Sequence, residues 1–168
     1  MSSRVNGRRK GHSAERRLVH LFSSWWGSEF FRTPGSGSFA TRGFIRTDGV
    51  DLSGDVVTTD PTFPFCIESK KVEGWTLDRF VHSPKTGELQ SWWKQARKEA
   101  ESCSRVPLLV FARNRIPEYV ALPVEYATVI TGSRIFLCID DHKDQEEVVF
   151  VCPLSSLLKV EKSLLIRK

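Results

Sequence analysis

Seven consecutive uncharged residues, Val106 to Ala112, set the strongest limit on the fold of this chain. A short apolar run of this kind is typical of a strand buried inside a sheet. The preceding residues, Leu89 to Cys103, carry apolar side chains at helical spacing and predict an amphipathic helix. A buried strand beside an amphipathic helix indicates a sheet with helices packed against it.

The remaining segments extend this pattern in both directions. A helix is predicted from Ser13 to a stop at Gly27, and a last helix from Pro153 to Lys162. Further strands are predicted at 55–58, 65–70, 119–122, 134–139 and 147–152. The order of elements favours an α/β fold with a mixed β-sheet flanked by helices. Two polar segments, 39–50 and 72–88, interrupt the order and are interpreted as insertions of irregular structure.

Composition places the chain among globular proteins with a local basic bias. It has 168 residues, with 25 Lys and Arg against 20 Asp and Glu. Its overall composition lies in the range of globular proteins and excludes a disordered or collagen-like chain. The excess lies in the first twenty residues, so we expect a flexible basic arm over 1–10 and one domain over 11–168. No apolar run is long enough to span a bilayer, and we expect a cytoplasmic protein with no membrane partner and no small-molecule cofactor.

Cysteine and histidine do not form a recognisable site. The four cysteines include no Cys-x-x-Cys pair, and Cys66, Cys138 and Cys152 lie in apolar runs, where reduced thiols behave as core side chains. The four histidines are scattered. The sequence therefore predicts neither a disulfide framework nor a structural zinc site.

The residues that point to chemistry are two acids beside apolar strand residues. Asp55 precedes Val56-Val57, and Glu68 follows Phe65-Cys66-Ile67 and precedes Ser69-Lys70. Alternation along a strand places Glu68 and Lys70 on one face. Two carboxylates and a backbone carbonyl suit Mg²⁺, and a nearby lysine can orient water beside a phosphate. The alternative is that Glu68 and Lys70 form a solvated ion pair and Asp55 caps a turn.

Four motifs in this order resemble a known nuclease family. They are Gly11-His12-Ser13-Ala14-Glu15-Arg16, Arg32-Thr33-Pro34-Gly35-Ser36-Gly37-Ser38, Asp55, and Glu68-Ser69-Lys70. Together they resemble the PD-(D/E)XK signature of archaeal-type Holliday junction resolvases and their phage-encoded relatives, over residues 7 to 115. The resemblance implies a restriction-endonuclease-like fold.

The resemblance also implies roles for individual residues. Glu15, Asp55 and Glu68, with the Ser69 carbonyl, would bind Mg²⁺, for which Mn²⁺ would substitute, and Lys70 would be the catalytic lysine. Arg16, Arg32, Ser36 and Ser38 would contact or position DNA phosphates. Separately from the resemblance, the charge of the basic arm assigns Arg8, Arg9 and Lys10 to DNA binding. Two alternatives stay open, because Glu15 also fits a salt bridge with its basic neighbours and Asp48 and Asp51 compete with Asp55 for the metal.

The function expected from this resemblance is metal-dependent phosphodiester hydrolysis that resolves four-way DNA junctions. Cutting two opposing strands of a two-fold junction requires two sites, so we expect a homodimer. Three alternatives are a restriction-like or repair nuclease acting on duplex or nicked DNA, a non-catalytic DNA-binding module, and an RNA-binding protein that uses its basic arm. Gln95 is interpreted as an exposed helix amide, and of Trp92 and Trp93 one is expected in the core and the other free for a partner.

Overall fold

A seven-stranded mixed sheet forms the centre of the protein. The computed structural model describes residues 7–33, 46–47, 50–51, 53–82, 87–140 and 146–166. The sheet order is β1-β4-β5-β6-β7-β9-β8, in which β5 and β6 are parallel and every other pair is antiparallel. The strands are Phe31–Arg32 (β1), Val56–Val57 (β4), Phe65–Lys71 (β5), Val106–Ala112 (β6), Tyr119–Pro123 (β7), Ile135–Asp140 (β8) and Glu146–Pro153 (β9).

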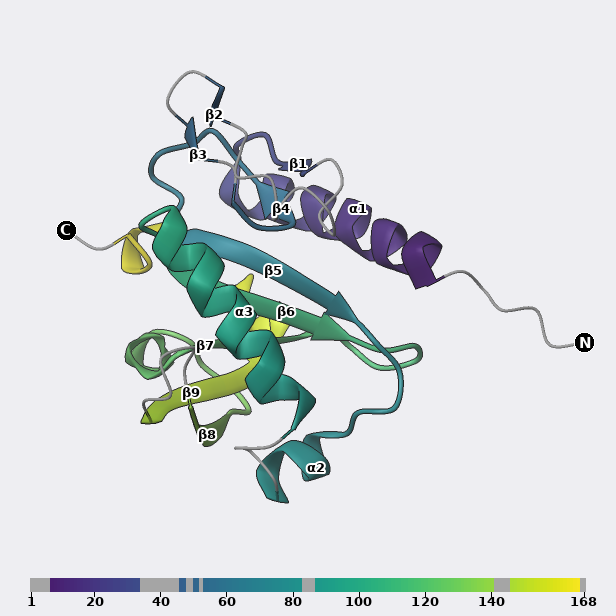
Figure 1. The fold of residues 1–168 in the computed structure, drawn as a ribbon. Helices are drawn as coiled ribbons and strands as arrows, with labels where there is room; N and C mark the ends of the chain where they lie inside the picture. Colours follow the sequence, from purple (N-terminus) through teal and green to yellow (C-terminus); the bar gives the residue numbers. More distant parts are fainter. Residues whose placement is uncertain are drawn as a thin grey trace, which may run out of the picture.

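Helices cover the two faces of this sheet (Figure 1). One face packs against the long helix α1 (Gly7–Trp26), the short helix α4 (Leu154–Leu157) and the 3-10 turns η2 (Val124–Thr128) and η3 (Lys162–Leu164). The other face packs against α2 (Leu77–His82) and α3 (Glu88–Ser102). This arrangement confirms the predicted α/β fold with a mixed sheet flanked by helices. No helix in the described residues is both long and apolar enough to cross a membrane.

The apolar run of β6 is buried on both of its faces, as its sequence predicted. Leu108 and Val110 pack in the α1 core, while Leu109 and Phe111 pack in the α3 core. α3 connects β5 to β6, and a crossover of this kind is what allows two successive strands to run parallel. The parallel pair lies in the middle of the sheet, so residues carried by β5 are held by neighbours on both sides.

The carboxyl-terminal third of the chain completes the core. β7 lies between β6 and β9, and both faces of these strands are buried. Val120 and Phe150 pack with α1, whereas Ala121 and Val149 pack with α3. Residues 116 to 166 therefore belong to the same folded unit as the strands that carry the predicted acids.

Four predictions about segments of the chain were wrong. α1 begins at Gly7 instead of Ser13, so residues 7–10 of the expected flexible arm are helical, since Arg and Lys are good helix formers. The segment 72–88 contains the helix α2, because Phe80 packs on the core beside Trp75. The last helix is only four residues long, since the chain turns so that Leu165 also reaches the core. Part of segment 39–50 pairs as the strands β2 (Arg46–Thr47) and β3 (Val50–Asp51).

Two predictions about single side chains were also wrong. Trp92 and Trp93 are both buried, because Phe80 of α2 covers Trp92 and the Trp93 indole donates to Glu147 Oε2 over 2.8 Å. Neither indole is therefore free for a partner. Cys138 is exposed and not a core thiol, because it alternates along the edge strand β8 with the buried Leu137 and Ile139 and so lies on the opposite, exposed face. None of the four cysteines, all of which lie in the described residues, forms a disulfide.

Candidate active site

Asp55 is held against β5 by a close approach of two backbone segments. The Asp55 amide donates to the Ile67 carbonyl over 2.8 Å, and Asp55 Oδ2 accepts from the Ser69 amide over 2.9 Å. Gly54 permits this contact, because it has a φ of +101° and a Cβ at this position would lie 2.7 Å from the Ile67 carbonyl oxygen. The turn before β4 therefore directs the Asp55 carboxylate over the centre of β5.

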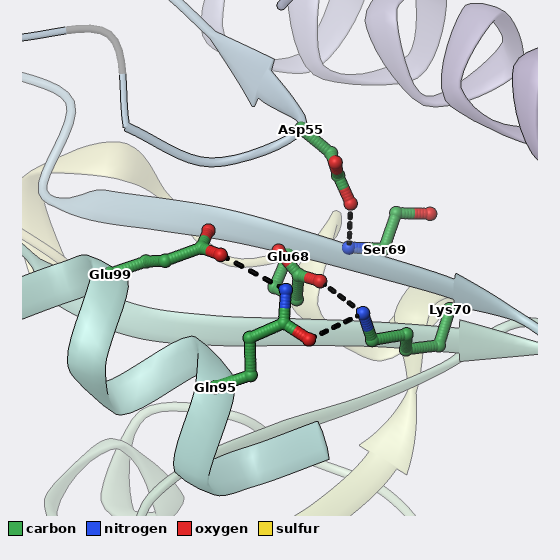
Figure 2. Close-up of polar contacts among 6 residues, drawn as sticks. All are labelled: Asp55, Glu68, Ser69, Lys70, Gln95 and Glu99. Carbon is green, nitrogen blue, oxygen red and sulfur yellow. Dashed lines mark hydrogen bonds and ion pairs between the residues drawn. The ribbon is translucent and has the colours of Figure 1, made fainter. Parts of the chain in front are cut away.

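Glu68 and Lys70 lie on the same face of β5, as alternation predicted (Figure 2). The Lys70 ammonium forms an ion pair with Glu68 Oε1 and donates to Gln95 Oε1 over 2.8 Å. Gln95 in turn donates through Nε2 to Glu99 Oε1 over 3.0 Å. A chain of polar contacts thus runs from the β5 carboxylate through Lys70 to two residues of α3.

Glu15 enters the site from the middle of α1 and is paired with Arg32 of β1. Both Nε and Nη2 of Arg32 lie 2.6 Å from Glu15 Oε2, and Glu15 is 7% exposed. A charge-assisted contact of this kind fixes the carboxylate in place. Arg32, which was expected to contact phosphate, is bound to Glu15 in this structure, so Glu15 does form a salt bridge, but with Arg32 of β1 and not with the basic neighbours in sequence that the alternative invoked.

Burial and neighbouring charges raise the pKa of two acids of the site. Burial raises the pKa of Asp55 to about 6, and the nearby charge of Glu15 adds to this shift, although the Ser69 amide opposes it. Burial raises the pKa of Glu68 well above its usual range, and the charges of Asp55 and Glu99 raise it further. Carboxylates that repel one another in a buried place are stabilised by a cation, and such groups often mark functional sites.

The donor atoms suit a hard divalent cation, although no such site is formed as the side chains stand. In the described part of the chain, no three His, Cys, Asp or Glu side chains form a group that would hold a metal ion. Glu68 is bound to Lys70 and Glu15 to Arg32, so a cation would compete with these partners. Carboxylate and carbonyl oxygens are nevertheless the ligands that Mg²⁺ and Mn²⁺ prefer, and the residues present fit that chemistry.

The structure describes the other predicted site residues only in part. Arg16 is exposed on α1, whereas Arg8, Arg9 and Lys10 belong to its first turns, where the backbone alone is described. Ser36, Ser38 and Asp48 lie outside the described residues. Asp51 belongs to β3, where the backbone alone is described, and Asp55 contacts β5.

Gln95 is exposed, as the sequence predicted, and Glu99 was not among the predicted site residues. The structure places both beside Lys70 and Glu68. Their four-residue spacing on the predicted helix was the available signal, because residues i and i+4 share one helix face. That spacing alone does not tell which face of the helix meets the strand.

Comparison with known proteins agrees with this geometry. A family model described as phage putative PDDEXK endonuclease matches residues 6–166. The chain therefore belongs to this family and is a nuclease of the PD-(D/E)XK type. The sequence-based identification of a phage-encoded PD-(D/E)XK relative is confirmed.

Two individual proteins are similar to this chain. Protein D14 of Escherichia phage T5 is 26% identical over 121 residues, which is 70% of this chain and 71% of that protein. Among solved structures, Hjc, a Holliday junction resolvase of the archaeal hyperthermophile Archaeoglobus fulgidus, matches with 14% identity and a TM-score of 0.41. That match covers 88% of this chain and 86% of the other. Because this TM-score is low, family membership rests on the family model.

Proposed function

We propose that this protein is a Mg²⁺-dependent DNA endonuclease that resolves four-way junctions. The observation that carries the proposal is the buried pair Asp55 and Glu68 on adjacent segments of the sheet, with the Lys70 ammonium in contact with Glu68. Buried acids with raised pKa values and an adjacent lysine have no evident structural use in a sheet. They suit the hydrolysis of a charged substrate such as a phosphodiester.

Each residue of the site has a role in this proposal. Asp55, Glu68 and the Ser69 carbonyl, with Glu15, would hold the cation, which when bound stabilises negative charge on phosphate oxygens. Lys70 is placed to donate to a phosphate oxygen or to orient water, and Gln95 fixes the direction of its ammonium. Attack of water on phosphorus then breaks the bond to the 3′ oxygen and leaves a 5′-phosphate and a 3′-hydroxyl, as the family resemblance implies.

The choice of a junction rests on the order of motifs in the sequence. The segment Arg32 to Ser38 and the helix containing Glu15 resemble archaeal-type junction resolvases, and the same resemblance supports a homodimer. We assign phosphate contacts to Arg16, Ser36 and Ser38 and to the basic residues Arg8, Arg9 and Lys10. Arg32 would also contact phosphate when a divalent metal ion replaces it at Glu15. For a phage nuclease that acts on such DNA, we expect a location in the cytoplasm of the host cell.

The test compares cleavage of a synthetic four-way junction with cleavage of a linear duplex of the same arm sequence. The protein is assayed in Mg²⁺, in Mn²⁺ and in EDTA, as wild type, as Glu68→Gln and as Glu88→Gln, a control at an exposed position on the first turn of α3. We expect rapid, metal-dependent cutting of the junction that Glu68→Gln abolishes and Glu88→Gln preserves. Equal rates on both DNAs would favour a restriction-like or repair nuclease. Tight junction binding without cutting in either metal would favour a non-catalytic module.

A further inference from the structure

A cleft of about 540 Å³ lies on the side of the sheet that faces α1, and it shares the elements α1 and β5 with the candidate active site. Its walls come from α1, the end of β5, the turn between β6 and β7, and α4. In Figure 1 this turn extends past the arrowhead of β5, on the same side of the molecule as the first turns of α1. Lys71, which lines the cleft, directly follows Lys70. Because side chains alternate along a strand, the two lysines point to opposite faces of β5.

The cleft is rich in positive charge. Four cationic side chains line it, Arg17, Lys71, Arg113 and Arg115, against the single carboxylate of Glu118. Glu118 is already paired with Arg17, since Arg17 Nε lies 3.1 Å from its Oε1. Within the described part of the chain, Lys71 and Arg115 have no carboxylate partner. A concave surface with this charge attracts an anion.

One of these cations has an unsatisfied donor. Arg113 Nε is buried and has no hydrogen-bond partner, while the guanidinium lies 5.6 Å from the centroid of the buried Trp75 ring. Stacking on an indole restrains a guanidinium without using its N–H groups. Arg113 is therefore fixed beside the cleft by Trp75, and its buried Nε has no protein acceptor.

The turn that carries these residues is fixed in an unfavourable backbone conformation. Arg115 has a φ of +65°, in the left-handed region that residues other than glycine seldom adopt. The turn is tied down at both sides, because the Asn114 amide donates to Glu73 Oε1 over 3.2 Å and the Val72 amide donates to the Ala112 carbonyl over 3.1 Å. Strain retained in this way is commonly found at binding sites.

We propose that this cleft binds phosphates of the bound DNA outside the phosphodiester that is cut. The inference rests on the proposed nuclease function. DNA carries one phosphate per 3.4 Å of axis on each strand, so a duplex that lies across the end of β5 brings one phosphate to Lys70 on one face of the strand and further phosphates to Lys71 on the other. Arg17 lies two residues beyond Glu15 on α1, so the cleft and the acidic site share both the helix and the strand that would lie along the DNA.

The test is the salt dependence of junction binding, measured by fluorescence anisotropy in EDTA, where nothing is cut. Lys71→Gln/Arg115→Gln should lower the slope of log affinity against log salt by about 1.8, because each lost phosphate contact removes about 0.9. Arg79→Gln/Arg105→Gln removes two charges elsewhere, on α2 and at the opposite end of β6, and should leave the slope unchanged. Thermal melting of each variant confirms that it is folded.

The outcomes separate the cleft from the catalytic proposal. Equal slopes for the cleft variant and the control variant would overturn the inference. Calorimetry with inorganic phosphate and with deoxyadenosine monophosphate provides a second arm. If either ligand binds wild type and not the cleft variant, while the DNA slope stays the same, the cleft belongs to a free phosphate compound and the inference is wrong. Wild-type protein that binds DNA through the cleft but cuts no DNA would refute the proposed activity alone.

Discussion

Replacing Asp55 with asparagine should stabilise the metal-free protein, and the gain should grow with pH. The pKa of Asp55 is about 6 in the folded protein, against 3.8 for the unfolded chain. A carboxyl whose pKa is raised by folding favours the folded state below pH 3.8, and this contribution is lost as pH rises through 6. From these two values, the charged form costs about 1.6 kcal/mol at pH 5 and about 3 kcal/mol at pH 8.

Urea unfolding in EDTA, followed by tryptophan fluorescence, measures this cost. The carboxamide introduced by Asp55→Asn keeps an acceptor oxygen for the Ser69 amide, so the substitution removes the charge without removing the hydrogen bond. Asp55→Asn should exceed wild type in free energy of unfolding by about 1.4 kcal/mol more at pH 8 than at pH 5. The pKa of Glu68 is also raised, in part by the charge of Asp55. Removing that charge makes ionised Glu68 less costly, which adds to the gain in stability of Asp55→Asn.

A second carboxyl provides a control of opposite sign. Hydrogen bonds from Ser28 and Thr62 lower the pKa of Asp60 from 3.8 to about 2, so its charged form stabilises the fold above pH 3.8 and this stability is lost as pH falls through 2. Asp60→Asn should therefore destabilise the protein by about 1–2 kcal/mol at pH 8. An Asp55→Asn protein that is less stable than wild type at pH 8, or a difference that does not change with pH, would refute the electrostatic account of the site.

Three further substitutions test individual contacts. Gly54→Ala should destabilise the protein by about 2–3 kcal/mol in urea unfolding, against about 1 kcal/mol for the control Gly74→Ala. Both glycines have a positive φ, but only at Gly54 would a Cβ also meet the backbone, since a Cβ at Gly74 has no atom within 4 Å. Lys70→Met should lower the cleavage rate about 10²–10³-fold while junction affinity in EDTA changes little; unchanged cleavage would remove Lys70 from the mechanism. Gln95→Ala should lower kcat about tenfold and change its pH profile with little effect on KM, because Lys70 loses an acceptor at 2.8 Å; an effect on KM alone would contradict a positioning role.

The parts of the site that the sequence could predict are those set by neighbouring residues. Alternation along a strand placed Glu68 and Lys70 on one face, and the apolar run from Val106 to Ala112 identified a strand buried on both sides. Gln95 and Glu99 depend instead on how α3 is rotated against β5, a packing arrangement that local periodicity does not contain. The burial of Trp92 likewise depends on α2, which sequence reasoning had treated as an irregular insertion.

The charges that are available to a partner also depend on packing and cannot be counted from the sequence alone. Residues 1–115 contain 19 basic and 12 acidic side chains, yet two of the cations nearest the site are paired with its own acids, Arg32 with Glu15 and Lys70 with Glu68. Under the proposed function, Arg32 and Lys70 become available to phosphate only when a divalent metal ion binds Glu15 and Glu68. Lys71 and Arg115 have no carboxylate partner among the described residues, so in the absence of metal the cleft is the stronger attraction for DNA. DNA binding without metal would then depend on Lys71 and Arg115, whereas cleavage with metal would depend on Lys70 and Arg32.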